Sequence, residues 1–100
     1  MNKAIVFTYD EFEELVYDVT YGIVGINWDM YDGWFWTEMF FEDEEWNEWL
    51  EEYGEETEAE INEFPDDEDL VYHMIGKKFN ATVKTVIVDV KGGEVAVIFE

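Results

Sequence analysis

The stretch ATVKTVIVDVKGGEVAVIF, residues 81–99, decides the fold class. Valines alternate with other residues on both sides of Gly92 and Gly93, and this period of two is typical of strands that bury one face. A glycine pair between two alternating runs favours a hairpin turn. We therefore predict that the chain closes with two antiparallel strands, at residues 81–90 and 94–99.

The segment before this hairpin has the signals of a helix at about residues 68–79. Asp66 or Asp67 can serve as its N-cap, because a carboxylate there accepts a hydrogen bond from a free backbone N–H group. Lys77 and Lys78 fall in its last turn, where cations complement the helix dipole.

Two helical segments separated by Gly54 are predicted further upstream. Asp43 can cap the first, and Gly54 can close it. Its apolar residues follow the i, i+3, i+4, i+7 spacing of one helix face: Trp46, Trp49, Leu50 and Tyr53. Thr57 and Glu60 have capping-box spacing, so they predict a short second segment, which Pro65 must end.

The N-terminal part predicts a strand at residues 3–8 that leads into a helix. Thr8 and Glu11 have the spacing of a capping box, and Gly22 is a suitable stop. The apolar residues between them again mark one helix face: Phe12, Leu15, Val16 and Val19. The opposite side carries a row of carboxylates at i, i+4 spacing: Asp10, Glu14 and Asp18.

An aromatic region follows, with the hairpin dipeptide Asp32-Gly33 at its centre. We predict strands at residues 26–31 and 34–40 on either side of this turn. Four of its aromatic residues are expected to pack in the core rather than to contact a partner: Trp28, Trp34, Phe35 and Trp36.

The elements together predict one α+β domain that spans residues 1–100. The order is β-α-β-β-α-α-β-β, with helices packed on one face of a small, mostly antiparallel sheet. About 48% of the residues are hydrophobic and 19% are aromatic, so a folded core is expected despite the charge. The chain contains no cysteine, and no run has the length of a signal-peptide core or a membrane span. We therefore expect a cytoplasmic protein, in the host cell if a phage encodes it.

Charge is the least ordinary property of the sequence. The net charge is −22, whereas a magnitude of roughly 2 to 8 is usual for a small domain. Residues 10–69 contain 24 acids and no lysine or arginine, and residues 42–69 alone contain 16 acids. The other 40 residues carry all five lysines and three acids. A general need for solubility would not require this segregation.

The usual catalytic and cofactor motifs are missing from the sequence. The oxygen ligands around Gly33 do not follow EF-hand spacing. His73 is the only histidine, so no zinc site based on several histidines can form, and a structural or surface role is expected for it. Glycoside hydrolysis requires a pair of carboxylates, and some such pair always exists among 27 acids. Its presence is therefore weak evidence for a glycosidase. We expect no enzyme activity, no cofactor and no metal site.

The dense acids suggest that the chain imitates a nucleic acid. As a helix, 28 residues would span about 42 Å, so 16 charges would lie roughly 2.6 Å apart, against about 1.7 Å along duplex DNA. Direct binding to nucleic acid or to an anionic membrane is disfavoured by repulsion. We expect carboxylates to occupy the lysine and arginine channel of a nuclease, repair enzyme or polymerase. The expected contact residues are Asp29, Asp32, Glu44, Glu45, Glu48, Glu51, Glu52, Glu55, Glu56, Asp66, Asp67, Glu68 and Asp69.

In size, charge and aromatic content the sequence resembles the small acidic inhibitors that phages and mobile elements use against restriction enzymes, CRISPR nucleases and DNA-repair enzymes. The resemblance implies a non-enzymatic inhibitor, monomeric or homodimeric. The sequence contains no motif of any one of these families, so the resemblance assigns no functional residues.

Other interpretations remain open at this point. An antitoxin-like or regulatory module could neutralise a basic protein without copying DNA. A salt-adapted domain would also be acidic, but its acids should be spread along the whole chain. The C-terminal third of this chain is nearly neutral and does not fit that pattern. A designed sequence is disfavoured by the irregular use of aromatic residues.

Overall fold

The computed structural model describes residues 3–29, 34–39, 43–64 and 66–100. Within these ranges, the side chains at positions 29, 34, 36–39, 43–46, 55 and 67 lie outside the description. The elements follow the order β-α-β-β-α-α-β-β, as the sequence predicts. The α+β fold class is therefore confirmed.

The first helix, α1 (Tyr9–Val19), begins and ends where the sequence places its signals. The Thr8 hydroxyl accepts a hydrogen bond from the Glu11 backbone N–H (3.2 Å), and the Glu11 carboxylate accepts one from the Thr8 N–H (2.8 Å). These two bonds form the predicted capping box. After Val19 the chain turns through two residues with positive φ, Tyr21 (57°) and Gly22 (82°), so the helix cannot continue.

The strands that the structure describes form two separate antiparallel sheets. The larger sheet has the order β1-β5-β4, with β1 at Lys3–Thr8, β4 at Val83–Asp89 and β5 at Glu94–Phe99. The smaller sheet is the hairpin of β2 (Val24–Asp29) and β3 (Trp34–Met39). The turn that the sequence places at Asp32-Gly33 lies outside the described residues.

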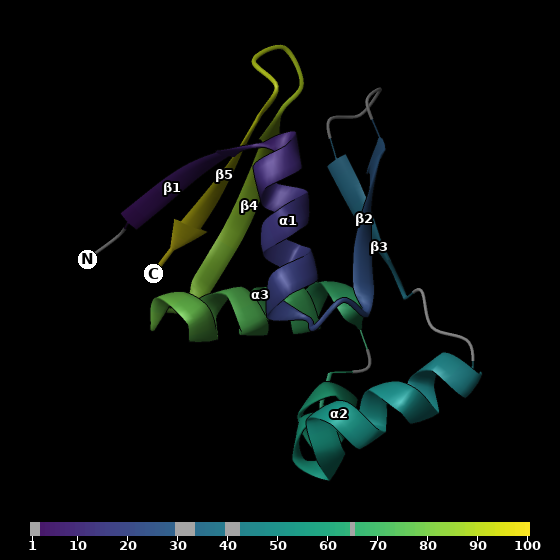
Figure 1. Cartoon of the computed structure of the whole chain (residues 1–100). Helices are drawn as coiled ribbons and strands as arrows, with labels where there is room; N and C mark the ends of the chain where they lie inside the picture. Colours follow the sequence, from purple (N-terminus) through teal and green to yellow (C-terminus); the bar gives the residue numbers. More distant parts are fainter. Residues whose placement is uncertain (1–2, 30–33, 40–42, 65) are drawn as a thin grey trace.

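Helix α1 lies between the two sheets and joins them (Figure 1). Phe12 is fully buried, and its ring lies near one aromatic ring of the larger sheet and two of the smaller one. The ring centroids are 6.5 Å from Phe7 on β1, 5.9 Å from Trp28 on β2 and 5.4 Å from Phe35 on β3. One buried side chain therefore couples both sheets to the same helix.

The aromatic residues of the smaller sheet pack inward where the structure describes their side chains. Phe35 is buried in the core, as the sequence predicts. Trp28 is half-buried, stacks on Tyr9 at 4.4 Å, and donates its indole N–H to the Glu13 carboxylate. The side chains of Trp34 and Trp36, also expected in the core, lie outside the description.

The second helix, α2 (Asp43–Asn62), is broken by a non-helical residue, Gly54 (φ 83°, ψ 175°). The sequence correctly predicts a stop at Gly54. The prediction that Thr57 caps a new segment is wrong, because helical geometry resumes directly after Gly54. Thr57 lies inside the second half, where its hydroxyl donates to the carbonyl of Tyr53 (3.0 Å).

Replacing Gly54 with alanine should destabilise the protein by about 1 to 3 kcal/mol, because this backbone region is open almost only to glycine. No heavy atom lies within 4 Å of an added Cβ, so the cost comes from the backbone and not from a clash. Urea unfolding of Gly54→Ala measures it. D-Alanine at position 54, introduced by chemical synthesis, is the matched control and should fold with nearly normal stability. Equal stability of the L-alanine variant and the natural protein would contradict the kink.

The third helix, α3 (Asp67–Phe79), crosses beneath α1 and the larger sheet (Figure 1). The Asp66 carboxylate accepts a hydrogen bond from the Glu68 N–H (3.0 Å), which makes Asp66 the N-cap. Lys77 and Lys78 occupy the last turn, and Asn80 ends the helix in a left-handed conformation. The buried face of α3 completes the core with Leu70, Val71, Met74 and Ile75.

Candidate partner-binding surface

The first half of α2 presents carboxylates on one side and is fixed by a tryptophan on the other. Trp49 is only 4% exposed, and its indole N–H donates to the carbonyl of Tyr21 at 3.2 Å. Glu48, Glu51 and Glu52 are all exposed. At 3.6 residues per turn, Glu51 points away from Trp49, whereas Glu48 and Glu52 lie one turn apart along one flank. The helix therefore directs these three charges toward solvent.

An aromatic joint connects α1 to α2. It consists of Tyr21, Trp49 and Tyr53, whose ring centroids lie 5.0 to 6.2 Å apart. Tyr21 and Tyr53 are each more than a third exposed, so the joint lies at the surface. Because Tyr21 lies two residues after the end of α1, the joint holds the first half of α2 beside that end.

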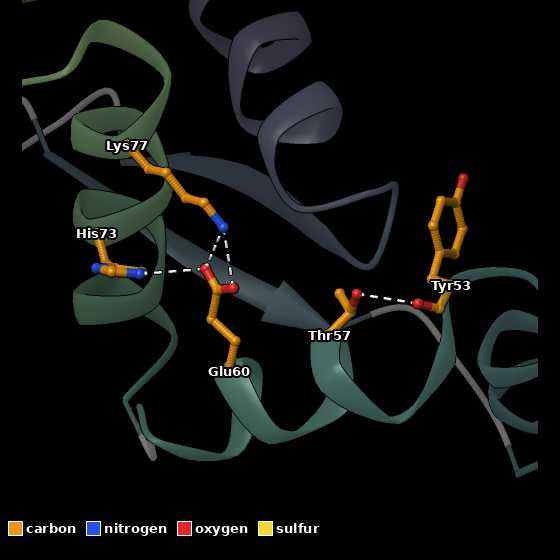
Figure 2. A network of polar contacts seen from close by, with 5 residues as sticks. All are labelled: Tyr53, Thr57, Glu60, His73 and Lys77. Atoms are coloured by element: carbon orange, nitrogen blue, oxygen red, sulfur yellow. Dashed lines mark hydrogen bonds and ion pairs between the residues drawn. The ribbon is translucent and has the colours of Figure 1, made fainter.

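The second half of α2 is attached to α3 by an ion-pair network (Figure 2). Lys77 Nζ lies 3.0 Å from both carboxylate oxygens of Glu60, and His73 Nε2 lies 3.2 Å from Oε1. The His73 ring also stacks on Phe64 at 4.5 Å. His73 thus has structural contacts, and the network fixes the helix on the far side of Gly54.

The network shifts the pKa of Glu60 and the pKa of Lys77. Partial burial alone would raise the pKa of Glu60, but the hydrogen bonds and charges of Lys77 and His73 hold that pKa below its ordinary value of 4.5. The same bond to Glu60 and the charge of Glu60 raise the pKa of Lys77. Glu60 is therefore ionised at neutral pH, and its charge is paired with Lys77 and His73 within the molecule.

Replacing Glu60 with glutamine should lower stability by roughly 0.5 to 1 kcal/mol at pH 7, a small value because Lys77 is 56% exposed. A carboxyl group whose pKa falls on folding stabilises the protein above its unfolded pKa and loses this effect as the pH falls through the folded value. The difference should therefore decrease as the pH falls through the pKa of Glu60, which lies below 4.5. Urea unfolding from pH 3 to 7 measures it, with exposed Glu63→Gln as the control. A difference that stays constant from pH 7 to pH 3 would contradict the ion pair.

The N-terminus of α3 carries a second group of expected contact residues. Asp66 and Asp69 are exposed, whereas Glu68 is half-buried beside Tyr72. Burial, followed by the charge of Glu68, raises the pKa of the Tyr72 phenol. Asp69 is thus open to a partner, whereas the exposed Asp66 also caps α3 and Glu68 is partly engaged within the molecule.

Helix α1 adds a carboxylate row that was not among the expected contact residues. Asp10, Glu14 and Asp18 are exposed along its outer side. A shallow groove of about 310 Å³ runs between this side and β2, lined by Asp10, Glu13, Glu14, Tyr17, Gly25 and Ile26. The i, i+4 spacing made the row visible in the sequence. The position of Asp18, at the end of the row, in a groove with Tyr21 of the joint and Lys77 of α3 depends on tertiary structure.

Two cations interrupt the acidic surface, so the segregation seen along the sequence is incomplete in space. Lys77 and Lys78 line a groove of about 370 Å³ together with Asp18, Val19, Tyr21 and Met74. Within the part of the chain that the structure describes, both salt bridges involve Glu60. The exposed carboxylates of α1 and of the first half of α2 form no salt bridge there.

The expected contact residues fall into three groups in the structure. The exposed ones lie on α2 and at the start of α3: Glu48, Glu51, Glu52, Glu56, Asp66 and Asp69. Glu68 is half-buried. Asp32 lies outside the described residues, as do the side chains of Asp29, Glu44, Glu45, Glu55 and Asp67.

Comparisons with protein-family models, curated proteins and solved structures give no match for this chain. Among the described residues, no three acidic or histidine side chains gather as a set that could hold a metal ion. The helices described here include none with the length and apolar character needed to cross a membrane.

Proposed function

We propose that this protein binds a basic nucleic-acid-binding protein and blocks it, with helical carboxylates in the place of phosphate groups. The principal contacts are Glu48, Glu51 and Glu52 on α2, extended by Glu56. Asp10, Glu14 and Asp18 on α1 continue the charge beyond the aromatic joint.

The observation that supports the proposal most is the way the first half of α2 is held. Trp49 is buried and hydrogen-bonded on one side of the helix, so the backbone that carries the exposed glutamates on the other side is held in place. A preorganised helix loses less backbone freedom on binding than a flexible acidic tail does. This arrangement suits a partner with a shaped basic channel.

The charge that remains available also supports the proposal. The described salt bridges are confined to Glu60, which leaves the exposed carboxylates of Glu48, Glu51 and Glu52 on α2 and of Asp10, Glu14 and Asp18 on α1 for the lysines and arginines of a partner. Opposite charge speeds encounter, with association rates up to about 10⁸ M⁻¹s⁻¹ or more at low salt. Binding should therefore weaken steeply as salt is added.

A second candidate function is that of an acidic regulatory module that does not copy DNA. The groove with Lys77 and Lys78 favours it, because duplex DNA has no cationic groups of its own. A partner that binds in this groove would need an acidic group on its otherwise basic surface to pair with Lys77 or Lys78. The two candidates differ in whether nucleic acid competes for the same surface of the partner.

The experiment is affinity capture from a bacterial lysate at low salt, with elution by a salt gradient. We expect one nuclease, polymerase or repair enzyme to elute at high salt, and duplex DNA to release it. A captured protein that binds DNA and this protein at the same time would support the regulatory module. Capture of only abundant basic proteins, all released at low salt, would contradict both candidates.

A further inference from the structure

Strand β2 has an open edge. Within the described part of the chain, β2 pairs only with β3. The Val24 backbone N–H donates to the Thr20 hydroxyl (3.3 Å), so it points away from β3. In an antiparallel ladder this direction repeats at every second residue. The N–H and C=O groups of Ile26 and Trp28 therefore also point away from β3, toward the open edge.

A groove borders this edge. It has a volume of about 310 Å³ and lies between β2, at Gly25 and Ile26, and the outer side of α1. Side chains alternate along a strand, so Ile26 faces the same side as Trp28, whose ring stacks on Tyr9 of α1. A further strand beside β2 would therefore extend the smaller sheet over the side chains of α1.

The α1 side of the groove determines the charge that such a strand must carry. Asp10, Glu13 and Glu14 line it together with Tyr17, which is 57% exposed. Glu13 accepts the Trp28 indole N–H, whereas Asp10 and Glu14 take part in no described salt bridge. Carboxylates form strong hydrogen bonds with lysine and arginine, and the face of a tyrosine ring also attracts cations. The groove is thus complementary to a basic strand.

We propose that β2 binds an extended basic segment of another protein as a third strand of the smaller sheet. The segment runs antiparallel to β2, the more stable pairing, and its backbone bonds to the N–H and C=O groups of Ile26 and Trp28. Residues directly opposite each other point to the same face. The residues that bond to β2 therefore direct their side chains toward α1, where lysine or arginine meets Asp10 and Glu14.

The same charges disfavour a second copy of this chain as the occupant. Open strand edges pair readily with one another, and charged side chains beside them oppose this. Two β2 edges that paired would bring two sets of α1 carboxylates to one place, and like charges repel. A basic segment gains from the carboxylates that an acidic one must overcome.

Titration with a synthetic peptide tests the proposal. The peptide has about seven residues, alternates threonine with lysine, and is capped at both ends. We expect it to slow the hydrogen exchange of the Ile26 and Trp28 N–H groups at least tenfold in about 0.05 M NaCl, as measured by NMR. Unchanged exchange at both groups in the presence of excess peptide would overturn the proposal.

Methylation of the peptide backbone separates strand pairing from general attraction between charges. A peptide with methyl groups on the backbone nitrogens of its lysines cannot donate to β2 and should bind at least tenfold more weakly. The same peptide with methyl groups on the threonine nitrogens has the same charge, and its affinity should change less than threefold. Equal affinities for the two peptides, or the reverse order, would overturn the antiparallel third strand.

Variants of the protein locate the site. Asp10→Lys with Glu14→Lys should weaken binding of the unmethylated peptide at least tenfold. Glu94→Lys with Glu100→Lys makes the same charge change at exposed positions beside the larger sheet, and affinity should fall less than threefold. Circular dichroism confirms that each variant is folded. Equal losses for the two double variants would overturn the groove as the binding site.

This inference goes beyond the proposed function and is tested separately from it. The peptide titration uses neither the captured partner nor the α2 glutamates. Capture of a nuclease by an α2-dependent surface can therefore succeed while the peptide fails to bind at β2, and the reverse outcome is equally distinct.

Discussion

Replacing Glu48 and Glu52 with lysine is expected to abolish binding to the captured partner while the fold stays intact. Both side chains are exposed and lie one turn apart on α2. Reversal turns two attractive contacts into two repulsive ones, and loss of a close interfacial charge pair costs about 2 to 5 kcal/mol. We expect at least a hundredfold loss of affinity, about 2.8 kcal/mol, in a calorimetric titration.

The matched control is the reversal of Glu94 and Glu100. These two acids are exposed at opposite ends of β5, and their replacement by lysine changes the net charge by the same four units. Affinity should then fall by less than threefold in the same calorimetric titration. Equal losses for both double variants would mean that total charge, and not the α2 surface, determines binding.

Replacing Phe12 with alanine is expected to cause the largest loss of stability of any single variant considered. Phe12 is fully buried and lies within 6.5 Å, centroid to centroid, of rings from both sheets. Removal of such a ring leaves a cavity and costs about 3 to 5 kcal/mol. The total stability of a small domain is about 5 to 15 kcal/mol, so the variant should be close to unfolding. Urea unfolding at pH 7 measures the change.

Tyr17→Ala is the control for this variant. Tyr17 belongs to the same helix but is 57% exposed, so its removal should change stability by less than about 1 kcal/mol. If Phe12→Ala lowers stability by less than 1 kcal/mol, the two sheets do not share the core that the ring positions describe.

Short-range signals account for much of what the sequence predicts correctly. The Thr8 and Glu11 side chains form their capping box, and Asp66 caps α3, because each depends only on residues within three positions. The positive φ of Gly54 explains the break in α2. Alternating valines likewise place β4 and β5 within two residues of their observed ends.

Long-range arrangement is what the sequence does not reveal. Thr57 has capping-box spacing with Glu60, yet Glu60 extends to Lys77 and His73 on another helix, and Thr57 bonds back to Tyr53. Spacing alone cannot show which of two partners a carboxylate will bind. The division of the five described strands into two sheets is also a tertiary property, because it depends on α1 lying between them.

The same distinction between short-range signals and long-range arrangement applies to the candidate surface. Exposure of Glu48, Glu51 and Glu52 could be predicted, because the apolar face of α2 leaves them on the other side. The aromatic joint could not, because Tyr21 and Trp49 are 28 residues apart. Nor does the sequence reveal that Lys78 lines a groove with Asp18.

The most direct measurement of DNA mimicry is a competition between this protein and duplex DNA for the captured partner. Fluorescently labelled DNA is held at a fixed concentration, and its displacement is followed by anisotropy as the protein is added. We expect complete displacement, with an apparent inhibition constant that rises in proportion to the DNA concentration. A complex that contains the partner, the DNA and this protein together would contradict the proposed substitution of carboxylates for phosphates.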